Sequence, residues 1–206
     1  MCKERKRIGI MGGTFDPIHI GHLILGETAY EQFHLDQVLF MPAGNPPHKR
    51  NRSNRATDEQ RTEMVKIAIA SNPHFALSLE EMNQDGFTYT YRTLERLKRQ
   101  NPDTDYFFIM GADSLYEFEK WREPGRILAA CTVLVATRDH TSDQRLDLAI
   151  ENLKEKYNSN IQKMYSLNID ISSKLIRSWI EQGRTLAYYV PDPVISYIQK
   201  NKIYRG

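Results

Sequence analysis

The stretch Ile8-Gly9-Ile10-Met11-Gly12-Gly13-Thr14-Phe15-Asp16-Pro17-Ile18-His19-Ile20-Gly21-His22 decides the fold of this chain. Its first four residues predict a buried strand that leads directly into Gly12-Gly13-Thr14. Glycines at such a turn let backbone N–H groups approach an anion, because no Cβ stands in the way. The stretch lacks the lysine of a Walker loop and the third glycine of a dinucleotide fingerprint. It therefore predicts a strand followed by a phosphate-binding turn of another kind.

Two histidines end this stretch. Pro17 fixes the turn, and His19 and His22 follow where a helix is expected to begin. A spacing of three places both imidazoles on one helical face, and a histidine, with a reference pKa of about 6.5, is partly charged at neutral pH and more so beside a phosphate. The pair can clamp phosphate, although a His-x-x-His alone more often caps or packs a helix start. A zinc site is disfavoured, because no Cys, Glu or third His stands nearby at ligand spacing.

The rest of the chain alternates short β-branched or aromatic runs with longer helical patterns. Strands are predicted near Arg7–Met11, Gln37–Met41, Phe75–Ser78, Tyr106–Met110, Cys131–Ala136 and Ile161–Ser166. Helices are predicted near Gly21–Gln32, Asp58–Ala70, Thr90–Gln100, Ser142–Lys156, Ser173–Gln182 and Pro193–Lys200. This alternation is typical of an α/β fold with a parallel sheet. The polar stretch Pro42–Thr57 is expected to overhang the carboxyl edge of that sheet, where ligands bind.

Composition limits the class of protein. The 206 residues are 40% hydrophobic, enough for one domain over residues 1–206, with a helical C-terminal portion at about 167–206. No apolar run approaches the roughly 20 residues that cross a bilayer, and the basic N-terminus lacks the apolar stretch of a signal peptide. Cys2 and Cys131 form no Cys-x-x-Cys motif, which suits a reducing compartment. We therefore expect a cytoplasmic protein without a membrane partner.

The charge balance argues against nucleic acid as a partner. A formal net charge of +2 is mild, whereas nucleic-acid binders usually carry strong, clustered positive charge. The one dense basic segment, His48–Arg55, lacks interleaved aromatic residues on which bases could stack. Binding of RNA by this segment remains a distant alternative. The sequence leaves the oligomeric state open.

A second candidate anion site lies near the C-terminus. Ser172-Ser173 precedes a helical run and predicts an N-cap, where backbone N–H groups at the positive end of the helix dipole suit an anion. Arg177 follows one turn later and can lean back toward that end. Alone, this pattern is more often an ordinary capped helix; together with the first loop it favours phosphate binding. Asp113 follows Gly111 just after a predicted strand, another position where ligand contacts are common.

Both motifs carry a resemblance to a known superfamily. His19-Ile20-Gly21-His22 and Ile171–Arg177 resemble the two signatures of the nucleotidyltransferase superfamily. Within it, the chain resembles the bacterial nicotinate-nucleotide adenylyltransferases over nearly its whole length; further matches are Pro46–Lys49, Tyr89-Thr90 with Thr93-Leu94, Gly111–Asp113, Trp121 and Val190–Tyr204. The resemblance implies a Rossmann-like, open, mostly parallel sheet with helices on both faces. It also implies transfer of an adenylyl group from ATP to nicotinate mononucleotide in NAD biosynthesis, with release of pyrophosphate.

The resemblance also implies roles for single residues. Expected ATP contacts come from Gly12, Gly13, Thr14, Phe15, His19, His22, Gly111, Asp113, Ser172, Ser173 and Arg177, among which His19, His22 and Arg177 are the expected catalytic residues. Expected contacts to nicotinate mononucleotide come from Asp16, Lys49, Thr90 and Trp121. The expected cofactor is Mg²⁺, held mainly by the triphosphate because Mg²⁺ keeps several waters and needs few protein ligands. No metal site built from protein side chains is therefore expected.

Several alternatives stay open at this point. Arg92 stands where the family usually has Asp, and Lys174 where it often has Thr, which leaves the helix contacts and one phosphate contact in question. Trp121 without the resemblance would more readily be a packing residue. Rival functions are a phosphopantetheine adenylyltransferase, a cytidylyltransferase, or a non-catalytic nucleotide-binding module with the same fold.

Overall fold

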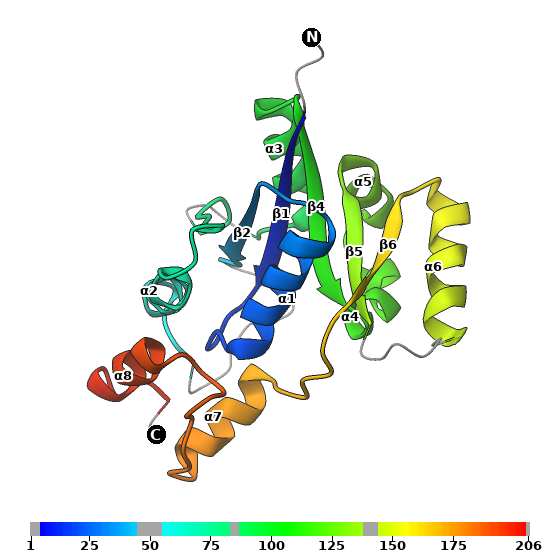
Figure 1. Cartoon of the computed structure of the whole chain (residues 1–206). Coiled ribbons are helices and arrows are strands. Elements are labelled where there is room, and N and C mark those ends of the chain that lie inside the picture. Colours follow the sequence, from blue (N-terminus) through cyan, green and yellow to red (C-terminus); the bar gives the residue numbers. More distant parts are fainter. Residues whose placement is uncertain (1–4, 45–54, 83–86, 138–143, 205–206) are drawn as a thin grey trace.

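The computed structural model describes residues 5–44, 55–82, 87–137 and 144–204, which form a sheet flanked by helices (Figure 1). Six strands lie in the order β3-β2-β1-β4-β5-β6, and each neighbouring pair is parallel. They are β1 (Lys6–Gly13), β2 (Gln37–Pro42), β3 (Phe75–Leu77), β4 (Thr104–Gly111), β5 (Thr132–Thr137) and β6 (Ile161–Tyr165). Each coincides with a predicted strand to within a few residues.

The predicted helices are present as well. They are α1 (Ile20–Gln32), α2 (Asp58–Ile69), α3 (Thr90–Gln100), α6 (Gln144–Tyr157), α7 (Ser173–Glu181) and α8 (Asp192–Lys200). Three short elements between β4 and β5 were not predicted: α4 (Ala112–Tyr116), the 3₁₀ helix η1 (Phe118–Lys120) and α5 (Pro124–Ala130). These are too short to show helical periodicity. The available signal was Pro124, which stands at the first position of α5, where proline is favoured.

Alternation along β1 explains why helices cover both faces of the sheet. Ile8 and Ile10 point into a cluster with residues of α3, α4, α5 and α6, whereas Met11 belongs to a cluster with residues of α1, α2, α7 and α8. Strands buried on both faces are typical of parallel sheets. The predicted Rossmann-like α/β fold is confirmed.

The strand order places a topological switch point between β1 and β4. The chain runs from β1 outward to β2 and β3, then returns to the other side of β1 as β4. In register, Met11 lies opposite Ile109 of β4 and Gly12 lies opposite Met41 of β2. In open α/β sheets, ligands bind in the crevice outside the carboxyl ends of the strands at this point. Figure 1 shows α7 beyond the tips of the strand arrows, at the same end of the sheet.

The C-terminal helices pack on the same core as the sheet. Ile176 and Trp179 of α7 and Val194 and Ile198 of α8 share one hydrophobic cluster with the sheet residue Met11. This shared core supports the single-domain organisation, which stays a prediction. Helix α8 begins one residue earlier than expected, with Pro191 in the cap position. None of the helices in the described ranges combines the length and the apolar character needed to span a bilayer.

Candidate active site

Two cavities meet at the switch point. The first, of about 310 Å³, is called here the Thr90 cavity and is lined by residues that include Thr14, Ala43, Glu81, Thr88 and Thr90. The second, of about 450 Å³, is called the histidine cavity and is lined by residues that include His19, His22, Gly111, Asp113, Ser172 and Ser173. Gly12, Phe108, Ser114 and Trp121 line both. Both volumes fall in the range of small-molecule sites, so the arrangement suits two ligands placed end to end.

The two histidines are held together at the start of α1. His19 is the cap residue, with φ −145° and ψ 171°, and its backbone N–H donates to Nδ1 of His22 at 3.2 Å. The ring centroids lie 3.7 Å apart. Because Nδ1 of His22 accepts this bond, a neutral His22 carries its proton on Nε2. The predicted pairing of the imidazoles is therefore present, and it fixes the tautomer of the second ring.

The charge expected on His19 is not found in this structure. His19 is 5% exposed, and its burial lowers the pKa from 6.5 to about 4. A neutral imidazole results at pH 7, contrary to the partial charge expected from the reference pKa, because desolvation disfavours the charged form. Its Nδ1 is buried without a hydrogen-bond partner among the described residues. Such a buried polar nitrogen at a cavity wall is costly unless a ligand satisfies it.

The turn before the histidines contributes backbone rather than side chains. Gly12, Gly13 and Thr14 line the cavities, whereas Phe15 is 1% exposed and lines neither. The Phe15 ring packs edge-on against His22, with centroids 5.0 Å apart. Its φ of +50° is in the left-handed region, which is uncommon for a bulky residue. The Phe15 side chain thus packs against His22, and only the backbone of Phe15 remains a candidate for nucleotide contact.

The second predicted motif forms the far wall of the histidine cavity. Ser172 is the cap of α7 and its Oγ accepts the N–H of Leu175 at 3.2 Å, as the sequence predicts. The Ser173 hydroxyl donates to the carbonyl oxygen of Pro17 at 2.9 Å. Arg177 lies one turn further along α7 and lines neither cavity. It is 17% exposed, and its Nη1 donates to the carbonyl oxygen of Asp16 at 2.5 Å. The two motifs are therefore joined directly through the backbone of the first loop.

Asp16 lies outside both cavities. It is 2% exposed, and its carboxylate accepts hydrogen bonds from Arg55, Ala56 and Tyr204. The predicted contact between Asp16 and nicotinate mononucleotide does not match this position, since protein donors surround the carboxylate. The sequence could not show this, because two of these donors come from the end of the polar stretch Pro42–Thr57 and the third from the C-terminal segment.

The remaining predicted residues divide between the two cavities. Thr90 begins α3 and lines the Thr90 cavity, while Gly111 and Asp113 line the histidine cavity at the start of α4. Trp121 is half-buried between them, tilted against Phe118 with centroids 5.5 Å apart. A Cβ on Gly111 would meet nothing within 4 Å. Lys49, with the rest of residues 45–54, lies outside the described residues.

Two charged residues near the site were missed. Glu81 lines the Thr90 cavity, accepts the Thr93 hydroxyl at 2.9 Å, and has its pKa raised, chiefly by burial. Arg61 of α2 is 3% exposed and donates to the carbonyl oxygens of Thr14 and Ala43. In the sequence, Arg61 reads as a solvated residue of an amphipathic helix, and nothing local reveals its burial. In the ranges that the structure describes, no three His, Cys, Asp or Glu side chains gather into a metal-binding group.

Known proteins share this sequence and fold. The chain matches the family model "Cytidylyltransferase-like" over residues 10–178. It is 40% identical over 199 residues to a protein of Lachnoclostridium phytofermentans named "Probable nicotinate-nucleotide adenylyltransferase", covering 97% of this chain and 99% of the relative. A relative of the same name from Clostridium botulinum (strain Alaska E43 / Type E3) is 41% identical over 200 residues, covering 97% and 98%.

Solved structures share the architecture. The structure titled "Plasmodium falciparum nicotinic acid mononucleotide adenylyltransferase complexed with NaAD" matches with a TM-score of 0.77 at 19% identity, over 97% of each chain. The same protein "complexed with APC" matches with a TM-score of 0.76 over the same shares. At this identity the likeness speaks for the fold alone. The sequence identity to curated relatives over nearly their full length, together with the paired motifs at the switch point, shows that the chain belongs to the nicotinate-nucleotide adenylyltransferase family within the cytidylyltransferase-like proteins.

Proposed function

We propose that this protein transfers the adenylyl group of ATP to nicotinate mononucleotide, giving nicotinate adenine dinucleotide and pyrophosphate. The observation that carries the proposal is the meeting of two cavities at Gly12, one walled by both phosphate-binding motifs and the other by Thr90 and Trp121. A reaction that joins two nucleotides needs such adjoining sites, because the attacking phosphate must reach the α-phosphorus of ATP. The names of the curated relatives support the choice of substrates.

The histidine cavity is the proposed ATP site. Gly12, His19, His22, Ser172 and Ser173 line the proposed place of the triphosphate, and Gly111 and Asp113 line that of the ribose. Gly13 and Thr14 line the adjoining Thr90 cavity, on the side where the two substrates would meet. Helix α7 supports this assignment, since its N-terminus at Ser172 offers backbone N–H groups at the positive end of the helix dipole. Arg177 adds a permanent positive charge, and its Nε and Nη2 hydrogen-bond to no residue of the described chain.

The Thr90 cavity is the proposed mononucleotide site. Trp121 offers an aromatic face at the junction and Thr90 a helix N-terminus, both suited to a pyridine ring that bears a carboxylate. Lys49, which lies outside the described residues, remains a proposed phosphate contact. Asp16 is not retained as a direct contact, since it is enclosed by protein groups.

Catalysis in this proposal rests on position and charge. A phosphate oxygen of the mononucleotide attacks the α-phosphorus, a new P–O bond forms, and the bond to the β-phosphate oxygen breaks as pyrophosphate leaves. No protein nucleophile is needed, because alignment of the two substrates supplies much of the acceleration. His22, with its proton on Nε2, and Arg177 stabilise the charge that develops on pyrophosphate.

The proposal includes Mg²⁺, bound to the ATP substrate. The polar groups around the histidine cavity are mainly side-chain hydroxyls, imidazoles and backbone N–H groups, and Asp113 supplies a carboxylate. This donor set suits an ion that the triphosphate holds and that needs few protein ligands. When bound, Mg²⁺ would neutralise part of the charge on the triphosphate oxygens. A cytoplasmic location and the absence of nucleic-acid partners stay predictions.

Pyrophosphate release tests the proposal. The enzyme is given Mg–ATP with nicotinate mononucleotide, with its amide, or with phosphopantetheine, each in a separate assay. Release with nicotinate mononucleotide, and formation of the dinucleotide in equal amount, is the expected result. Release with phosphopantetheine alone would assign the chain to another activity of the superfamily, and ATP binding without release under any condition would indicate a non-catalytic module.

A further inference from the structure

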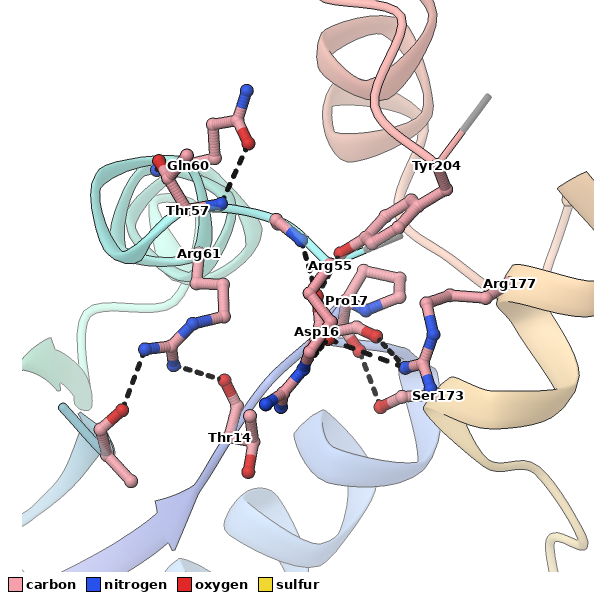
Figure 2. Close-up of polar contacts among 12 residues, drawn as sticks. Thr14, Asp16, Pro17, Arg55, Thr57, Gln60, Arg61, Ser173, Arg177 and Tyr204 are labelled. Atoms are coloured by element: carbon pink, nitrogen blue, oxygen red, sulfur yellow. Dashed lines mark hydrogen bonds and ion pairs between the residues drawn. The ribbon is translucent and has the colours of Figure 1, made fainter. Parts of the chain in front are cut away.

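The first loop, residues 14–19 between β1 and α1, is held in place by side chains of two helices. Nη1 of Arg61 donates to the carbonyl oxygen of Thr14 at 2.6 Å, Nη1 of Arg177 to that of Asp16 at 2.5 Å, and the Ser173 hydroxyl to that of Pro17 at 2.9 Å. Figure 2 shows these donors on either side of the loop, Arg61 from α2 and the other two from α7. Carbonyl oxygens that are bound in this way cannot turn toward an anion, which they would repel. The loop is thereby shaped before any substrate arrives.

Asp16 is the centre of this support. Its Oδ1 accepts the Tyr204 hydroxyl at 2.7 Å and the backbone N–H of Ala56 at 3.1 Å, and its Oδ2 accepts Nε of Arg55 at 3.0 Å. Nη1 of Arg177 lies 3.6 Å from Oδ2. A carboxylate that is 2% exposed needs such compensation, because burying an unpaired charge is very costly. Asp16 therefore joins the first loop to three segments far away in the sequence.

Tyr204 is the member of this cluster that comes from the C-terminal segment. It is 3% exposed and adopts a φ of +63°, a left-handed conformation that is unfavourable for a large side chain. Conformations of this kind persist where the surroundings impose them, and they gather at functional sites. Burial, together with the Asp16 charge, raises the pKa of the Tyr204 hydroxyl, so that it stays protonated and donates.

Arg177 is the group through which this cluster can reach the substrate. Its Nη1 is engaged by Asp16, while its Nε and Nη2 bond to none of the described residues. One side of the guanidinium is thus fixed by the protein and the other is left for a phosphate. A planar guanidinium that is held along one side presents its other donors in a defined direction. The Asp16 carboxylate acts on Arg177 through the 3.6 Å ion pair, and the Asp16 backbone acts through the hydrogen bond to its carbonyl oxygen. A shift of the carboxylate therefore weakens the ion pair that helps to orient those donors.

We propose that Tyr204 is a positioning residue for adenylyl transfer: by holding the Asp16 carboxylate, it orients the Arg177 guanidinium beside the histidine cavity. The inference rests on the proposed function. It assigns to the C-terminal segment an effect on the rate of the reaction, although neither Tyr204 nor Arg177 lines a cavity; Arg177 lies one turn along α7 from Ser173, which lines the histidine cavity. Substrate affinity in the Thr90 cavity does not depend on this contact.

The test compares two tyrosine hydroxyls in the full-length enzyme. Tyr204→Phe removes the donor to Asp16. The control Tyr106→Phe removes the hydroxyl of another buried tyrosine, 5% exposed, which donates to the carbonyl oxygen of Leu97 and lines neither cavity. We expect kcat to fall about 10-fold in Tyr204→Phe, the scale of a lost hydrogen bond to a charged group. The KM for nicotinate mononucleotide should stay unchanged, and Tyr106→Phe should keep its kcat within about twofold. A kcat for Tyr204→Phe equal to that of the control, at temperatures where both are folded, overturns the proposal.

A double-mutant cycle with Arg177→Lys identifies the route of the effect. If Tyr204 acts through Arg177, Tyr204→Phe should change kcat by less than about twofold once Arg177 has been replaced, because coupled residues are not additive. Full additivity would contradict the proposal even if both single variants were slow. Asp16→Asn serves as a second variant of the same shape and should lower kcat at least as much as Tyr204→Phe. Failure of the wild-type enzyme to release pyrophosphate would reject the proposed function instead, so the two failures are distinguishable.

Discussion

The backbone N–H of His19 donates to Nδ1 of His22 at 3.2 Å, so the first residue of the His-x-Gly-His motif sets the tautomer of the second. With Nδ1 occupied as an acceptor, a neutral His22 has its donor on Nε2. The motif thus provides one oriented N–H donor without requiring a charged imidazole. Together with the edge-on Phe15 ring, this bond leaves the His22 side chain little freedom to reorient.

The substitution His22→Asn separates these two functions. The amide oxygen of the introduced side chain can still accept the N–H of His19, but the donor at the position of Nε2 is lost. We expect kcat for pyrophosphate release to fall about 100-fold or more, the scale of removing one preorganised donor, with little change in the melting temperature. The same substitution at the exposed His34, whose φ of +46° asparagine tolerates, is the control and should leave kcat unchanged. An unchanged kcat with a raised KM for ATP would reduce His22 to ground-state binding.

Trp121 should matter most for the mononucleotide. Truncation to alanine removes the aromatic face at the junction of the cavities, and stacking of an aromatic side chain on a base contributes about 1–3 kcal/mol. We expect the KM for nicotinate mononucleotide to rise about 10-fold or more. The KM for ATP, measured in the same variant, should rise less. Equal increases for both substrates would place the indole in the packing of the site instead, through its contact with Phe118.

Gly111 offers a test of the ATP site that leaves the fold intact. Its φ of −81° suits any residue, a Cβ there would meet nothing within 4 Å, and serine is a good helix cap, so Gly111→Ser should not lower the melting temperature. In the proposed complex the added side chain would occupy space that the nucleotide needs. Overpacking of this kind costs about 1–3 kcal/mol, and we expect the KM for ATP to rise about 10-fold. An unchanged KM in this variant would move the ribose away from Gly111.

The sequence predicts the strands, the main helices and the fold class, because these depend on local patterns of residues. Apolar runs of strand length alternating with helical periods locate all six strands of the described ranges, and the cap at Ser172 is visible as a residue type. The position of the two motifs at one edge of the sheet follows from strand order alone. The two motifs that the sequence singles out, at Gly12 and at Ser172, therefore line the same cavity, as the predicted fold requires.

What the sequence could not show depends on contacts between distant segments. Tyr204 reaches Asp16 only because α7 and α8 fold back over the first loop, and the carbonyl oxygen of Tyr189 accepts the N–H of Ile20 through the same packing. The burial that lowers the pKa of His19, and the burial of Arg61, are likewise tertiary. The surroundings of Asp16 are tertiary for the same reason: its place in a motif does not reveal which groups surround its carboxylate.

The lowered pKa of His19 makes stability depend on pH. The folded-state pKa is about 4 and that of the unfolded chain about 6.5, so between these values the unfolded chain binds a proton that the folded protein does not. The contribution to stability is complete above pH 6.5 and is lost progressively as the pH falls toward 4. Between pH 6.5 and pH 4 this loss of unfolding free energy amounts to about 3 kcal/mol. His19→Asn, which keeps a cap residue without a titrating group, should show a smaller loss of unfolding free energy between about pH 7 and about pH 4.5 in urea titrations. Other titrating groups are common to both proteins and cancel in the difference, so parallel pH profiles would show that folding leaves the pKa of His19 unchanged.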